Sequence, residues 1–153
     1  MDQSVMMALA KAGGLAALGL GAVGSAIGSG LAGASAIGAW KKCYAQGKAA
    51  PFILITFIGA PLSQTIYGMI LMTTISGVAA DPERAAASWA ACLFAGIFGG
   101  MGLGTSAWFQ GKAGAAGADA LAETGQGFGN YLMTLGVVET VALFVLVFSM
   151  MGL

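Results

Sequence analysis

Four long runs of apolar residues divide the sequence, and short polar stretches separate one run from the next. The runs cover residues 12–38, 51–79, 85–112 and 128–152. At about 1.5 Å per residue, each run is long enough to cross a hydrocarbon core of about 30 Å as a helix. An Ala-rich continuation of the third run to about Glu123 is also expected to be helical. The pattern predicts an all-α membrane protein with four transmembrane helices.

The four predicted helices fall into two similar halves, residues 1–79 and residues 80–153. Each half has a Gly-rich helix, a short connection and then a bulkier helix. An offset of 75 positions places Gln64 on Glu139, so both halves carry a polar side chain in the middle of the bulkier helix. The pattern predicts two tandem helical hairpins that arose by duplication.

Small residues line the first and third predicted helices. Glycines recur at four-residue spacing in both, at Gly24 and Gly28 and then at Gly96, Gly100 and Gly104. Such spacing lets helix backbones approach closely in lipid. Because the first helix is small on almost every face, we expect neighbours on several sides, as at the inner wall of a ring of subunits. The bulkier helices suit the outside. A compact monomer with one Gly-lined interface is the alternative.

Composition agrees with a membrane location. The 153 residues are 58% hydrophobic and 8% charged, with a net charge of zero and a mean hydropathy of +0.88. A soluble domain usually carries about 25% charged residues. The absence of His excludes His-based catalysis and His metal sites, and no basic run suggests nucleic acid. Cys43 and Cys92 have no zinc-site spacing and are expected to be free thiols.

The basic residues predict an orientation. Lys41, Lys42 and Lys48 lie between the first two helices, and Lys112 lies at the connection of the last two. The positive-inside rule then places both of these loops in the cytoplasm and both termini outside. The first apolar run is too long for the core of a signal peptide, so the first helix is expected to remain uncleaved.

One carboxylate, Glu139, interrupts the apolar fourth run near its middle. A charged side chain at the bilayer centre costs about 2.5–3.5 kcal/mol on insertion scales. Ionisable residues at such positions usually serve ion or proton handling and have a partner. Glu139 is therefore the leading candidate for a functional residue, ahead of a purely structural role.

Other polar residues accompany Glu139. Ser63, Gln64 and Tyr67 share one face of the second helix, because they stand three and four positions apart. Tyr67 could donate its hydroxyl to the Glu139 carboxylate. The third helix offers Gln110, which counting along the helices places about two turns closer to the cytoplasm than Glu139. Each of the four has a structural alternative, as a hydroxyl bonded to its own helix, as an interhelical hydrogen bond or as packing.

A proline stands beside this group. Pro61 cannot donate a backbone hydrogen bond, which frees a carbonyl one turn earlier, nominally that of Phe57. Together the helices offer one carboxylate, two amide oxygens, a hydroxyl and a carbonyl, which are the ligands of hard cations. A single carboxylate favours a monovalent ion over Ca²⁺ or Mg²⁺. The additional oxygens suit Na⁺, whereas H⁺ needs only the carboxyl group and a neighbour that steadies it.

At this point the chain resembles a known family over essentially its whole length. PLSQTIYG at Pro61–Gly68, FQGKAGAAG at Phe109–Gly117 and VVET at Val137–Thr140 are similar to motifs of the proteolipid (K, or c-type) subunit of V-type and V/A-type rotary ATPases. The similarity is to sodium-transporting bacterial members. Ser63 stands where those relatives carry Thr, which keeps the hydroxyl.

The resemblance implies a homo-oligomeric ring that forms the membrane rotor, in a bacterial plasma membrane. It implies partners in a stator protein that carries an arginine and in a central stalk that docks on the cytoplasmic loops. ATP is hydrolysed or made in other subunits, so the chain is not itself an enzyme. The resemblance assigns Tyr67 to hold the glutamate and assigns Na⁺ to Glu139, Gln64, Gln110, the Ser63 hydroxyl and the backbone carbonyl of Ala60.

Three alternatives remain open at this stage. The first keeps the rotor and changes the coupling ion to H⁺. The second is a small ion-coupled secondary transporter that works as a monomer or dimer. The third is a membrane scaffold that transports nothing.

Overall fold

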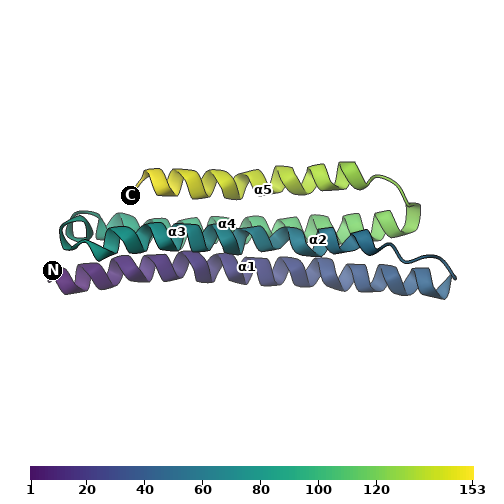
Figure 1. Ribbon diagram of the computed structural model, residues 1–153, viewed down its shortest axis with the longest axis horizontal. Helices are drawn as coiled ribbons and strands as arrows, with labels where there is room; N and C mark the ends of the chain where they lie inside the picture. Colours follow the sequence, from purple (N-terminus) through teal and green to yellow (C-terminus); the bar gives the residue numbers. More distant parts are fainter.

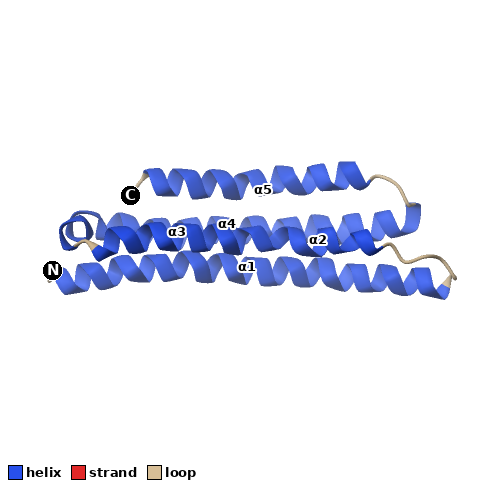
Figure 2. Ribbon diagram, in the orientation of Figure 1, coloured by secondary structure: helices blue, strands red, loops and turns tan.

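The computed structural model describes the whole chain, Met1–Leu153, and contains helices joined by short turns (Figures 1 and 2). Four helical segments are long and apolar enough to cross a membrane, which confirms the predicted all-α fold class. In order, the elements are α1 (Gln3–Ala45), the 3₁₀ helix η1 (Phe52–Leu54), α2 (Ile55–Gly59), the 3₁₀ helix η2 (Ala60–Leu62), α3 (Ser63–Ala80), α4 (Pro82–Thr124) and α5 (Phe128–Met151).

The helices run alternately along one axis (Figure 1). The chain passes along α1, returns through α2 and α3, runs forward again in α4 and returns in α5. Both termini therefore lie at one end of the molecule, with the turn between α3 and α4. The α1–α2 and α4–α5 connections lie at the other end. This is the arrangement that an even number of membrane crossings requires.

α1 and α4 each contain 43 residues and are longer than the predicted spans of residues 12–38 and 85–112. The Ala-rich continuation of the third apolar run is helical as expected, and it ends at Thr124. Gly125 stops α4 in a left-handed conformation, with φ of 69°. A helix of this length spans about 65 Å, so α1 and α4 extend beyond a hydrocarbon core of about 30 Å.

Small residues bring α1 and α4 together as the most extensive pair in the molecule. A Cβ atom added to Gly24 would overlap the backbone of Gly104, and one added to Gly96 would overlap the backbone of Gly13. The two predicted glycine ladders meet within one chain at Gly24 and Gly104, and Gly96 of the second ladder lies against Gly13. By contrast, Gly30 and other glycines on the far side of α1 face open space.

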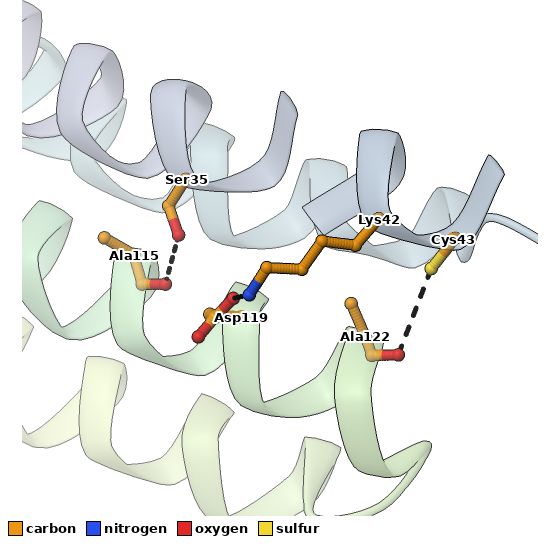
Figure 3. A network of polar contacts seen from close by, with 6 residues as sticks. All are labelled: Ser35, Lys42, Cys43, Ala115, Asp119 and Ala122. Carbon is orange, nitrogen blue, oxygen red and sulfur yellow. Dashed lines mark hydrogen bonds and ion pairs between the residues drawn. The ribbon is translucent and has the colours of Figure 1, made fainter. Parts of the chain in front are cut away.

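Polar contacts tie the two long helices together at the loop end (Figure 3). The Ser35 hydroxyl donates to the carbonyl oxygen of Ala115 at 2.7 Å. Lys42 Nζ lies 3.0 Å from Asp119 Oδ1, and this is the one salt bridge in the chain. At the opposite end, Asp81 caps α4 by accepting from the backbone nitrogens of Glu83 and Arg84.

The second spanning segment is interrupted. Although the sequence predicts one helix over residues 51–79, the α-helical ladder changes to 3₁₀ geometry at Ala60–Leu62, where Pro61 is buried against Gly28 of α1. Pro61 lacks the N–H that a regular α-helical turn requires. The segment still crosses as one unit, but its backbone is irregular in mid-span.

Two apolar clusters fill the interior on either side of this break. One lies towards the termini and includes Leu71, Ile75 and Leu146. The other lies towards the loops and is built around Phe57, which packs edge-on against Phe128 at 5.8 Å between ring centroids. The break and its polar neighbours occupy the level between the clusters, so apolar packing fixes the helices above and below them.

Candidate ion-binding site

A polar site lies between the two apolar clusters, where α3, α4 and α5 meet. Gln64 from α3 and Gln110 from α4 are fully buried, while Glu139 from α5 and Tyr67 from α3 are half-buried. Glu139 stands near the middle of the 24-residue α5. Buried amides need hydrogen-bond partners, and both glutamines find them within the site.

The Glu139 carboxylate accepts two hydrogen bonds. Tyr67 Oη donates to Oε1 at 2.8 Å, and Gln110 Nε2 donates to Oε2 at 3.3 Å. No Lys or Arg reaches the carboxylate, since the chain's one salt bridge lies elsewhere. The carboxylate is therefore oriented by neutral donors, and its charge is not balanced by the protein.

The two glutamines are joined directly. Gln64 Nε2 donates to Gln110 Oε1 at 2.9 Å, and Gln110 Nε2 also donates to the backbone carbonyl of Leu135 at 3.1 Å. The expectation that Gln110 lies about two turns from Glu139 is wrong, because the Gln110 amide reaches the carboxylate. Helix packing and a long side chain close the gap that counting residues along separate helices suggested.

Three oxygens gather on the α3 side. Ser63 Oγ lies 3.1 Å from the carbonyl oxygen of Ala60 and 3.2 Å from Gln64 Oε1. The hydroxyl has one proton and can donate to one of these two acceptors at a time. The other acceptor oxygen then faces a lone pair of the Ser63 hydroxyl, and the two oxygens repel each other. A cation bound between them would remove this repulsion.

The two carbonyls considered for the site have different surroundings. The sequence argument from Pro61 pointed to Phe57, but the Phe57 carbonyl lies against Gly114 of α4. The role of the Phe57 carbonyl as a ligand stays a prediction from the numbering of a regular helix. The Ala60 carbonyl, named by the family resemblance, is the one beside Ser63 and its neighbour Gln64.

Sequence reasoning missed Ser106. Its side chain is 5% exposed, donates to the carbonyl of Val138 at 3.0 Å and lies 3.5 Å from Gln64 Nε2. Ser106 precedes Gln110 by one helical turn, so both face the same neighbours. The four-residue spacing from Gln110 could have indicated Ser106 as a member of the site. A single hydroxyl in a segment of small residues does not stand out in the sequence.

The arrangement brings together every side chain predicted for the site. It offers one negative charge and several neutral oxygens in a seam between helices, which suits a singly charged cation of the hard type. No group of three or more His, Cys, Asp or Glu side chains exists anywhere in the chain to hold a divalent or transition metal. Pro61 is buried within the 3₁₀ turn that carries Ala60 and leads into Ser63.

The second hairpin has known relatives. Residues 89–151, which form most of α4 and all of α5, match the family model for the C subunit of ATP synthase. The second hairpin is therefore similar to the C subunit of ATP synthase, over a match that covers less than half of the chain. The matched segment contains Glu139, Gln110 and Ser106. A comparison with curated protein sequences found no match.

Proposed function

We propose that this chain is a rotor-ring subunit of a V-type rotary ATPase that binds one Na⁺ at Glu139 and carries it past the stator as the ring turns. The ligands are the Glu139 carboxylate, the side-chain oxygens of Gln64 and Gln110, the Ser63 hydroxyl and the Ala60 carbonyl. Tyr67 holds the carboxylate in place. The family match to the second hairpin supports the rotor role, and the first hairpin supplies the remaining ligands.

One observation carries the choice of Na⁺. Ala60 O and Gln64 Oε1 lie 3.1 Å and 3.2 Å from Ser63 Oγ, with one hydroxyl proton for the two acceptors. A proton-carrying site needs a carboxyl group and a partner, and it gains nothing from three converging oxygens. A hard cation takes several oxygens at once, so their convergence favours Na⁺ over H⁺.

The mechanism follows from the cost of charge in lipid. An empty Glu139 is an anion with no basic partner in its own chain, and such a group is costly at the bilayer centre. A bound Na⁺ neutralises it and lets the subunit face hydrocarbon. At the stator, an arginine of the partner replaces Na⁺ as the counter-charge, as the resemblance implies. The ion then leaves, and another is loaded before the subunit re-enters lipid.

Labelling of Glu139 by a hydrophobic carbodiimide tests the assignment. The reagent attacks a protonated carboxyl group, so bound Na⁺ should slow the reaction at constant pH. The proposal predicts protection by millimolar Na⁺ and none by equal concentrations of a large organic cation. Labelling that is indifferent to Na⁺ and slows only as the pH rises would favour the rotor that carries H⁺.

The transporter and scaffold alternatives are separated from the rotor by assembly. Native mass measurement of the detergent-extracted protein should give a large closed ring, whereas a secondary transporter would give a monomer or dimer. The central stalk is proposed to dock on the loop end, where α1 and α4 extend past the start of α5. The proposed orientation places that end in the cytoplasm, in a bacterial plasma membrane.

A further inference from the structure

Two serines of α1 have no hydrogen-bond partner in the protein. The hydroxyl oxygens of Ser25 and Ser29 are both buried, and neither finds a donor or acceptor within reach. Ser25 as a residue is 2% exposed. Leaving a buried hydroxyl unpaired is costly, so such groups in folded proteins usually have a partner, often ordered water.

Both serines face the interrupted helix of the first hairpin. Along α1, Gly21 lies against the backbone of Gln64, Gly28 against Pro61 and Gly33 against Ile58. At about 100° per residue, Ser25 and Ser29 lie on the face between the directions of Gly21 and Gly33. Their hydroxyls therefore lie in the seam between α1 and the Ala60–Leu62 turn.

The other side of that turn is the candidate ion site. Ser63 Oγ lies beside Ala60 O and Gln64 Oε1 there. The backbone of this turn also packs against α1, where Gly28 lies against Pro61 and Gly21 against Gln64. At this level the backbone is 3₁₀ in form, and Pro61 supplies no N–H to the turn before it. Hydroxyls without a partner thus stand opposite an irregular turn in the middle of a membrane segment.

We propose that Ser25 and Ser29 bind ordered water in this seam, and that the water bridges their hydroxyls to backbone carbonyls of the Pro61 turn. The site takes water because it offers hydroxyls and carbonyls, carries no charge and lies between packed helices. Buried water of this kind typically makes about three hydrogen bonds. The bridging water fixes the turn on its α1 side and so positions the Ala60 carbonyl and the Ser63 hydroxyl for the ion. This role rests on the proposed function, whereas the water site itself does not.

The two substitutions Ser25→Ala and Ser29→Ala give opposite results under the two hypotheses. If the hydroxyls are unpaired, removing both should stabilise the protein and leave Na⁺ protection of Glu139 unchanged. If they hold bridging water, the double variant should need about tenfold or more Na⁺ for equal protection, as for other outer-shell partners of metal ligands. Ser35→Ala is the matched control, because Ser35 lies on the same helix and bonds Ala115 at the remote loop end.

A density map of the assembled ring that resolves ordered water provides the second measurement. Density within hydrogen-bond distance of both serine hydroxyls and a carbonyl of the Pro61 turn is expected. Hydroxyls turned onto carbonyls of their own helix, with no density between α1 and the turn, would overturn the proposal. If wild-type labelling proves indifferent to Na⁺, the sodium assignment fails, and the map alone then decides the water site.

Discussion

The phenol hydroxyl of Tyr67 donates a 2.8 Å hydrogen bond to Oε1 of Glu139, and this bond joins α3 of the first hairpin to α5 of the second. α3 and α5 pack against each other far less than either packs against the Gly-rich helices. The bond therefore holds the carboxylate towards the interior, where Gln110 meets its second oxygen.

Tyr67→Phe is expected to release the Glu139 carboxylate without emptying the site of ligands. Hydrogen bonds to charged groups contribute about 1.5–3 kcal/mol, so Na⁺ affinity should fall by roughly ten- to a hundredfold. Protection against carbodiimide labelling measures the change. Tyr44→Phe is the control, since Tyr44 is 71% exposed at the loop end of α1. An unchanged affinity for Tyr67→Phe would mean that the bond has no part in binding.

Glu139→Gln should abolish ion-coupled transport and labelling while the ring still forms. The substitution keeps the size of the side chain and an acceptor for Tyr67 but removes the charge that retains the cation. Glu139→Asp keeps the charge on a shorter stem, so it should bind Na⁺ more weakly than the wild type. Transport that survives in Glu139→Gln would support the scaffold alternative or a different site.

Gln110→Ala should lower both stability and Na⁺ affinity. The substitution removes an acceptor from Gln64 Nε2 and a donor from Glu139 Oε2 in the interior, at about 1–3 kcal/mol for each group. Thermal unfolding in detergent measures the first effect and labelling protection the second. Gln126→Ala, in the exposed turn before α5, should change neither. A variant that loses stability but keeps full affinity would show that Gln110 is structural and not a ligand.

Gly24→Ala tests the close contact of α1 with α4. The added Cβ would overlap the backbone of Gly104, so the helices must separate, at about 1–3 kcal/mol. Gly38→Ala on the same helix meets nothing within 4 Å and should be neutral or stabilising by up to about 1 kcal/mol. Thermal melts of both variants give the comparison. Equal melting temperatures would contradict the packing described for the seam.

The Lys42–Asp119 pair is expected to matter little. The hydrogen bond from Lys42 and the charge of Asp119 raise the pKa of Lys42 above its ordinary 10.5. A raised pKa in the folded state means that protonated Lys42 stabilises the fold fully at pH values below 10.5, the pKa of an unfolded Lys. This stabilisation is lost only as the pH rises through the higher pKa that Lys42 has in the folded protein. Both side chains are at least half exposed, so solvent screens the pair. Lys42→Ala should melt like the wild type throughout the neutral range, and a clear fall there would contradict this.

The sequence was sufficient for the four spanning segments and for the contact of Tyr67 with Glu139, but not for the other contacts around the carboxylate. Hydrophobic runs fix where helices occur, and the isolated Glu139 stands out because charge is rare in lipid. Counting residues could not predict the position of Gln110 along the membrane normal relative to Glu139, because they lie on different helices. That relative position depends on helix tilt and on side-chain reach, which packing determines. The position of the Ala60 carbonyl depends on the 3₁₀ turn, which Pro61 permits but does not specify. Ser106 was missed because one hydroxyl among small residues carries little signal.

A density map of the assembled ring at the height of Glu139, recorded with Na⁺ and again with only a large organic cation, tests the central claim most directly. A peak among Glu139, Gln64, Gln110, Ser63 and the Ala60 carbonyl that appears only with Na⁺ is the predicted result. The same map in both buffers, with the carboxyl group bonded to Tyr67 and no density among the oxygens, would contradict sodium binding.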